Sequence, residues 1–226
     1  MKTDELIERL GQTSEPVSRL RPPSTRAALW FALGIPYVAL VVGVMSPRSD
    51  LFTKLSDPVY LIEEFAALAT GIAASLAAFV SIVPGFDRRI LLLPVFPFAI
   101  WLGSLGLGCL ESWIQLGPDG LSVHPDWFCF PAISLVGMVP AIAMALMLRH
   151  GAPLTPHLST ALGGLAAAGL GNFGLRLFHP QDASIMVLVW QMGTVFVLTA
   201  LAGWAGGLLL DWRSLLETAR RQVGYR

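Results

Sequence analysis

Charged side chains are scarce in this sequence. Asp, Glu, Lys and Arg together make up 13% of the 226 residues, whereas an ordinary soluble domain carries roughly 25%. No Lys or Arg occurs between Arg89 and Arg149. So long a stretch without a basic residue excludes an ordinary water-soluble fold and indicates a protein that lies in lipid.

The sequence also lacks the common motifs of enzyme catalysis. It contains no phosphate-binding loop, no His-Glu-x-x-His motif and no recognisable Ser-His-Asp constellation. We therefore expect neither an enzyme nor a protein that carries a cofactor. The first and last three hydrophobic segments show no internal repeat, although such repeats are common in transporters.

Long hydrophobic segments are the main feature that is present. About 20 helical residues cross a hydrocarbon core of about 30 Å, and the segments here do not alternate as the strands of a barrel do. We predict an all-α membrane protein with an arm at 1–26, a six-helix bundle at 27–210 and a tail at 211–226. The predicted transmembrane helices are Ala27–Met45, Val59–Val83, Ile90–Leu110, Trp127–Leu148, Leu158–Phe178 and Ile185–Leu210.

Basic residues fall mainly on one side of this topology. The arm, the turns after the second and fourth helices and the tail carry twelve Lys and Arg residues, and the loops on the other side carry three. Because short cytoplasmic segments are enriched in Lys and Arg, both termini are predicted to face the cytoplasm. The arm has no apolar core directly after a basic segment, so we do not expect a cleaved signal peptide.

The arm begins like a soluble amphipathic helix. In "MKTDELIERL", Thr3 suits an N-cap and acidic residues occupy the first turn, and Gly11 ends the segment. Its five basic and four acidic residues nearly cancel, which argues against direct binding of nucleic acid, since that needs a basic stripe. Its apolar stripe suits a groove on a partner protein, although a helix lying on the lipid surface would show the same pattern. The stripe consists of Leu6, Ile7 and Leu10, with Val17 and Leu20 beyond them.

Three short stretches resemble the NrsF family, whose members are negative regulators of an extracytoplasmic-function sigma factor of the sigma F type. The first stretch is "MKTDELI" with the pairs that follow it, Pro16-Val17, Arg19-Leu20 and Pro22-Pro23. The second is "LRHGAP" at 148–153, which closes the fourth predicted helix, and the third is "FHPQDAS" at 178–184. The resemblance implies an integral anti-sigma factor of the bacterial inner membrane that holds its sigma factor and releases it under stress.

Such a protein needs a cytoplasmic docking surface, and the predicted topology offers two. The arm is the preferred surface, with the apolar stripe as the part that contacts the sigma factor. These residues are Leu6, Ile7, Leu10, Val17 and Leu20. The tail, "DWRSLLETARRQVGYR", is the alternative, although Trp and Leu beside arginines also suit an interfacial anchor.

The sequence has two cysteines, and both fall at the outer ends of predicted helices. Cys109 and Cys129 bracket one loop without basic residues, on the oxidising side of the membrane, where disulfides persist. A disulfide between them would close a loop of about 20 residues and contribute about 3 kcal/mol of stability. Glu111, His124 and Asp126 lie in the same layer. Thiol, imidazole and carboxylate groups suit soft or borderline metal ions, so Cys109, Cys129, His124 and Glu111 are candidate metal ligands.

The family resemblance favours Cys129 as a sensing residue. It stands where NrsF proteins carry a Cys before the fourth helix, and the family's cysteines are tied to the response to heavy metals and to oxidants such as dichromate. His179, also a candidate, is followed directly by Pro180, whereas relatives carry a Cys after this His. Either Cys109 takes over that role or the sensor uses one thiol. The alternative to a sensing role is a structural one, in which the cysteines only pack against their neighbours and His124 only belongs to a turn.

Glu63 and Glu64 support a rival class of function, a small proton- or ion-coupled transporter. Carboxylates inside a membrane often form ion sites, but these two lie near one end of the predicted helix and could extend toward the interface. Arg176 has Asp182 as its expected partner across the last outer loop. Small residues spaced for close helix packing occur at Gly163, Ala167, Gly171, Gly203 and Gly207.

Overall fold

The computed structural model describes residues 3, 8, 20–85, 87–123, 125–151, 154–180 and 184–210. Every regular element within these residues is a helix. Six helical segments are long and apolar enough to cross a membrane. The predicted all-α architecture with six such helices is confirmed, and the side on which the termini lie stays a prediction.

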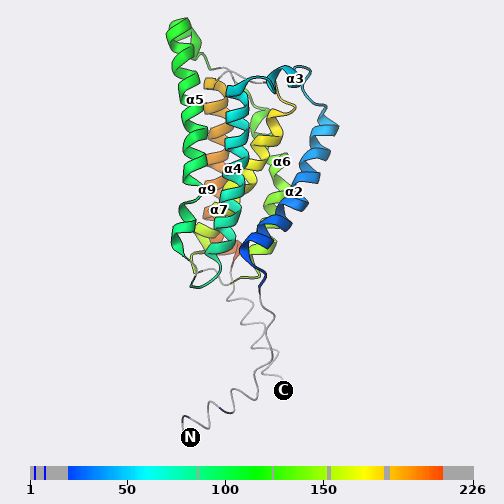
Figure 1. Cartoon of the computed structure of the whole chain (residues 1–226), viewed down its shortest axis with the longest axis vertical. Coiled ribbons are helices and arrows are strands. Elements are labelled where there is room, and N and C mark those ends of the chain that lie inside the picture. Colours follow the sequence, from blue (N-terminus) through cyan, green and yellow to red (C-terminus); the bar gives the residue numbers. More distant parts are fainter. Residues whose placement is uncertain are drawn as a thin grey trace.

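The long helices lie side by side along the length of the molecule (Figure 1). We call the end of the bundle that carries α3, at the top of Figure 1, the upper end, and the end where α2 begins the lower end. The elements are α2 (Pro23–Met45), α3 (Leu51–Lys54), α4 (Pro58–Ser81), η1 (Arg88–Leu92), α5 (Val95–Leu116), η2 (Gly117–Leu121), α6 (Cys129–Leu148), α7 (Pro156–Arg176), α8 (Ser184–Met186), the π-helix η3 (Val187–Met192), α9 (Gly193–Trp204) and α10 (Gly206–Leu209).

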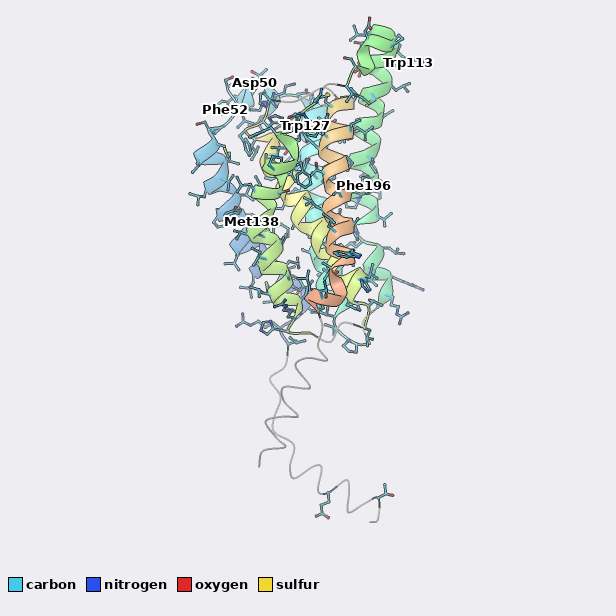
Figure 2. All side chains as sticks on the ribbon, turned by 180° about the vertical axis from the view of Figure 1, so that it is seen from behind. Asp50, Phe52, Trp113, Trp127, Met138 and Phe196 are labelled. Carbon is cyan, nitrogen blue, oxygen red and sulfur yellow. The ribbon has the colours of Figure 1, made fainter. Side chains whose placement is uncertain are left out.

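The third membrane helix differs most from its predicted bounds of Ile90–Leu110. The 3-10 turn η1 replaces its first turn, and α5 begins only after Pro94, which has no N–H to donate to a preceding turn. α5 then continues past Leu110 and ends at Gly117, whose φ of 62° suits glycine. Its last turns extend beyond the neighbouring helices, with Trp113 near the tip (Figures 1 and 2).

The sixth membrane helix is interrupted by the π-helix η3. A π-helical turn inside a helix often coincides with a local structural or functional demand. Here the fully buried Gln191 accepts a hydrogen bond from Asn172 Nδ2 of α7 at 3.0 Å. A polar side chain in an apolar bundle needs such a partner, so this contact helps to fix the sixth helix against α7.

α7 packs against α4, α6 and α9 and occupies the middle of the bundle (Figure 1). Its small residues allow this close approach. A Cβ atom at Gly171 would lie 2.9 Å from Ile133 O, and one at Gly163 would lie 2.8 Å from Met144 Cγ. A Cβ atom at Gly203 of α9 would lie 3.2 Å from Ala161 Cβ of α7. The packing role predicted for Gly163, Gly171 and Gly203 is therefore confirmed.

Large apolar side chains cover the outside of the bundle. Phe52, Trp113, Met138 and Phe196 all stand on the outer surface (Figure 2), and each is about half exposed or more. A soluble monomer rarely exposes so much contiguous apolar surface. The surface fits a bilayer, in which lipid tails cover these side chains at no hydrophobic cost.

A buried ion cluster joins α7 to α4 near the upper end. Arg176 Nη2 lies 2.8 Å from Glu63 Oε2, and Arg176 Nε lies 2.7 Å from Glu64 Oε1. Tyr60 donates its hydroxyl to the Arg176 carbonyl oxygen at 3.1 Å, and the guanidinium carbon lies 4.9 Å from the centre of its ring. Asp182, the partner expected from the sequence, lies outside the described residues. Because Glu63 and Glu64 are paired with a cation, the cluster weighs against the transporter hypothesis.

Arg176→Gln is expected to lower the thermal unfolding midpoint of the detergent-solubilised protein strongly. The substitution leaves two buried carboxylates without their cation, and breaking a buried pair in this way costs about 3–5 kcal/mol. Arg88→Gln, at an exposed arginine of η1, makes the same chemical change and should melt like the wild type. Adding Glu63→Gln and Glu64→Gln should recover part of the loss. A normal midpoint for Arg176→Gln would show that the cluster does not hold α4 against α7.

Candidate metal and thiol site

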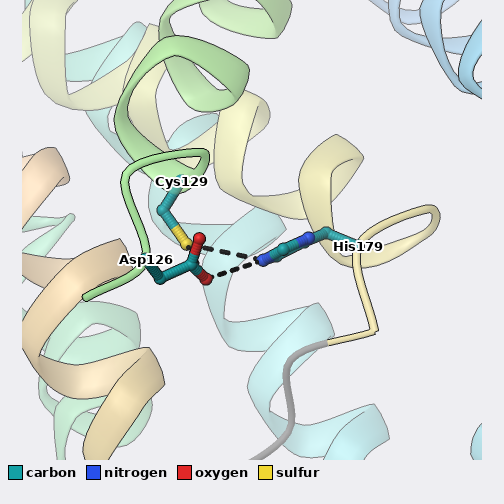
Figure 3. A group of neighbouring side chains, drawn as sticks. All are labelled: Asp126, Cys129 and His179. Carbon is teal, nitrogen blue, oxygen red and sulfur yellow. Dashed lines mark hydrogen bonds and ion pairs between the residues drawn. The ribbon is translucent and has the colours of Figure 1, made fainter. Parts of the chain in front are cut away.

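The candidate site lies at the upper end, where the start of α6 meets the turn that follows α7 (Figure 3). Asp126 and Cys129 are three residues apart at the start of α6, a spacing that places two side chains on one side of a helical turn. Asp126 Oδ1 accepts a hydrogen bond from Phe128 N at 3.3 Å, which orients the carboxylate. His179 closes the end of α7 through its N–H, which donates to Leu175 O at 2.8 Å.

The three side chains converge on one point (Figure 3). The Cys129 thiol donates to Asp126 Oδ2 at 3.1 Å, and His179 Nε2 lies 2.9 Å from the same oxygen. Cys129 Sγ and His179 Nε2 are 3.6 Å apart. Within the described part of the chain, these are the three His, Cys, Asp or Glu side chains whose ligand atoms all lie within 4.8 Å of one another.

Asp126 carries the negative charge of the site. Burial raises the pKa of its carboxyl, but hydrogen bonds from Cys129 and His179 stabilise the carboxylate more strongly, so that its pKa lies below the ordinary value. The stability that this lowered pKa contributes is present above the ordinary aspartate pKa and is lost as the pH falls through the lowered one. At neutral pH, Asp126 is therefore ionised and accepts both hydrogen bonds.

The thiol lies at the back of the site. Cys129 is fully buried, whereas the side chains of His179 and Asp126 are 16% and 13% exposed. The Phe128 ring centre lies 5.5 Å from the centre of the His179 ring and covers one side of it. An ion or a small oxidant that enters therefore meets the imidazole and the carboxylate before it reaches the sulfur.

The three ligand atoms lie close enough together to share one metal ion, and two of their three separations are shorter than tetrahedral coordination would set. Bonds of about 2.0 Å to nitrogen or oxygen and about 2.3 Å to sulfur separate neighbouring ligand atoms by about 3.3–3.8 Å. The observed separations are 2.9, 3.1 and 3.6 Å. Binding would release the thiol proton, because the thiolate is the ligand. Three protein ligands would leave a fourth position open, as in sites that react or exchange their ligands.

The structure brings together two predicted sensing residues, Cys129 and His179, and adds Asp126 as their common partner. Cys109 does not belong to this cluster. Both cysteines are free thiols, so the disulfide considered from the sequence is not formed. The physical reason is the length of α5, which continues about two turns past Cys109, whereas Cys129 is the first residue of α6.

Of the two other predicted ligands, Glu111 lies away from the site. Glu111 is exposed and accepts a hydrogen bond from Gln115 of its own helix at 3.0 Å. His124 lies outside the described residues. The sequence did place Asp126 in the correct layer, and its spacing from Cys129 was a usable signal. Its contact with His179 was missed, because nothing in the sequence relates the start of α6 to the end of α7.

The predicted sigma-factor surface falls mostly outside the described residues. These are Leu6, Ile7, Leu10 and Val17 of the arm, and the tail at 211–226. Leu20 is described and is exposed just before α2 begins. An apolar side chain in that position is compatible with a contact to a partner, and the surface as a whole stays a prediction.

Comparison with known proteins gives a family for most of the chain. The model of the NrsF family, described as "Negative regulator of sigma F", matches residues 10–212. The matched range contains all three residues of the candidate site. Comparisons with curated proteins and with solved structures find no match.

Proposed function

The chain belongs to the NrsF family of negative regulators of sigma F, and we propose that it is a membrane-bound anti-sigma factor controlled by Asp126, Cys129 and His179. It holds an extracytoplasmic-function sigma factor at the bacterial inner membrane. It releases this factor when the site captures a soft metal ion or is oxidised. The convergence of a thiol, an imidazole and a carboxylate at one end of the bundle carries this proposal.

The distribution of charge supports a periplasmic position for the site. Described basic residues at the lower end are Arg21, Arg26, Arg88, Arg89 and Arg149. Those at the upper end are Arg48, Lys54 and Arg176. Arg48 pairs with Asp50 at 2.6 Å, and Arg176 pairs with the two glutamates of α4. The lower end therefore carries the excess of basic residues expected of a cytoplasmic side.

Contacts at the lower end of α6 offer a route from the site to both candidate docking segments. Arg26 of α2 donates its Nη2 to Met147 O, and Arg149 donates its Nε to Leu209 O of α10 at 2.8 Å. α2 follows the arm in the chain and α10 precedes the tail. Because α6 is one continuous helix from Cys129 to its lower end, a displacement at its first turn would reach both contacts.

The same sulfur can respond to two kinds of stress. A metal ion would replace the thiol proton and take both Cys129 and Asp126 as ligands. An oxygen-transferring oxidant such as a peroxide would be attacked by the thiolate, its O–O bond would break, and hydroxide would leave. The sulfur then becomes a sulfenic acid and has lost the two electrons that the oxidant gains. Either event ends the present hydrogen bond from the thiol to Asp126.

Copurification tests this function. Tagged protein, solubilised from membranes in detergent, should retain the sigma F-type factor of its own cell and should release it when micromolar Cd²⁺ is added. Mg²⁺ at the same concentration should release none, because a hard cation does not favour thiolate. If no sigma factor is retained, the anti-sigma function is wrong. If it is retained but cadmium releases none, the assignment of the site is wrong.

Reporter fusions should establish the orientation of the bundle. A reporter that is active only in the periplasm should work when fused after Gly117, at the end of α5, and after Asp182. It should fail after Gly151, which follows α6 at the lower end. A reporter active only in the cytoplasm should give the opposite pattern at the same three positions. Periplasmic activity after Gly151 would reverse the orientation and move the site to the cytoplasm.

A further inference from the structure

A second polar site lies at the opposite end of the molecule. A cavity of about 400 Å³ opens where α2 begins and α6 ends. Its lining, as far as the described residues form it, combines basic and apolar side chains, and none of these residues is acidic. The lining residues are Leu20, Arg21, Arg26, Leu29, Met147 and His150.

Arg26 is the unusual member of this lining. It is 5% exposed, its Nη2 donates to Met147 O, and its guanidinium carbon lies 4.6 Å from the centre of the Phe79 ring. Its Nη1 is buried and has no hydrogen-bond partner among the described residues. No carboxylate among the described residues forms an ion pair with it. A buried charge is costly unless it is paired, so Arg26 calls for an anion nearby.

The surroundings of Arg26 favour the same kind of ligand. Arg21 is exposed at the mouth of the cavity. His150 donates Nδ1–H to Leu146 O at 2.8 Å, and in its imidazolium form the ring also offers Nε2–H to an anion. α2 begins at Pro23 without a side-chain cap. Backbone N–H groups of its first turn therefore have no side chain that accepts their hydrogen bonds. Cations, an imidazole and an uncapped helix start together form an anion site.

The apolar part of the lining indicates which anion fits. Leu20, Leu29 and Met147 contribute hydrocarbon to the same cavity. Beyond it, exposed apolar side chains continue along both helices, at Leu33 of α2 and Leu146 of α6. Both helices are membrane spans, and the cavity lies at their ends. We propose that it binds the phosphate headgroup of an anionic phospholipid, with the acyl chains along α2 and α6.

In the orientation predicted from the charge distribution, this cavity lies on the cytoplasmic side, where anionic lipids attract basic segments at the ends of membrane helices. An acidic side chain of a partner protein could also bind the basic residues of the cavity. It would not, however, contact the apolar surface that continues beyond the cavity, which the acyl chains of a lipid would cover. The lipid would also lie beside Leu20, so it would contact the chain where the arm enters the bundle.

Native mass spectrometry of the full-length protein tests this site. The protein in mild detergent is titrated with phosphatidylglycerol or with phosphatidylcholine of the same acyl chains. One phosphatidylglycerol should be retained in preference to phosphatidylcholine. Arg21→Gln and His150→Gln are exposed positions that should leave the fold intact, and each should weaken the retention about tenfold, as expected for the loss of a charge-assisted hydrogen bond. Arg88→Gln, an exposed arginine outside the cavity, is the matched control and should bind like the wild type.

Three outcomes would overturn the lipid assignment. In the first, both cavity variants retain phosphatidylglycerol like the control. In the second, millimolar inorganic phosphate raises the melting midpoint as much as the lipid does, which would indicate a site for free phosphate. In the third, Arg21→Gln weakens capture of the sigma factor while lipid retention is unchanged, which would indicate an acidic protein surface.

Discussion

Replacing Cys129 by serine is expected to abolish induction of the sigma factor's regulon by cadmium or dichromate, while repression in unstressed cells persists. Serine has a similar size but supplies no thiolate, which is the soft ligand that such ions prefer. Loss of the Cys129 thiolate should weaken metal binding by more than the roughly 10–100-fold that removal of an outer-shell partner causes. A transcriptional reporter for the regulon, read with and without cadmium, measures the effect.

Cys109→Ser is the matched control for this experiment, because it makes the same change at the other cysteine. Cys109 lies outside the cluster and forms no disulfide, so this variant should be induced like the wild type. His179→Gln and Asp126→Asn should shift the response to higher metal concentrations, since each removes one ligand and leaves the thiol. Loss of induction in Cys109→Ser, with a normal response in Cys129→Ser, would show that the sensing thiol was assigned to the wrong residue.

The double substitution Leu6→Asp with Leu10→Asp should release the sigma factor and switch on its regulon without stress. Two charges on the apolar stripe would remove two anchors of the predicted docking surface. Anchor residues at interfaces contribute about 2 kcal/mol or more each, so affinity should fall about 1,000-fold. The amount of protein in the membrane should be unchanged, because the six spans insert without the arm.

The double substitution Gln12→Asp with Ser14→Asp is the matched control, because it adds the same charge to the arm away from the stripe. The sigma factor's regulon should stay repressed in this variant. If both double variants are silent, the arm is not the docking surface. The tail then becomes the candidate, and Leu215→Asp with Leu216→Asp should release the sigma factor instead. If both switch the regulon on equally, the total charge of the arm matters and the stripe does not.

The membrane helices could be predicted because their signal is local. A run of about 20 apolar residues is sufficient to identify a span, and five of the six predicted spans required only small changes at their ends. The third span required more, since the predicted segment was bounded by hydropathy, whereas α5 ends where Gly117 adopts a positive φ. A helix that continues beyond the apolar run gives no signal in hydropathy.

Contacts between helices could not be predicted in the same way. Pairing Arg176 with Glu63 and Glu64 requires that α4 and α7 are neighbours, whereas the sequence offered only Asp182, which is close along the chain. The same holds for the candidate site. Cys129 and His179 were each identified from the sequence, but their contact through Asp126 depends on α6 lying against α7. The sequence can thus identify single residues with functional chemistry. Which of them contact one another depends on how the helices pack.

The ion cluster of Arg176 gives the two walls of the candidate site unequal stiffness. His179 follows α7 by three residues, and the end of α7 is fixed to α4 by two ion pairs at 2.8 and 2.7 Å. α6 itself, from Cys129 to Leu148, contains no charged residue and so forms no ion pair with a neighbouring helix. A ligand that changes the distance between the two walls should therefore displace the wall that is held less firmly, so that α6 moves and α7 serves as the stationary frame. Spin labels on α6 would then change their distance to α4, whereas labels on α7 would keep theirs.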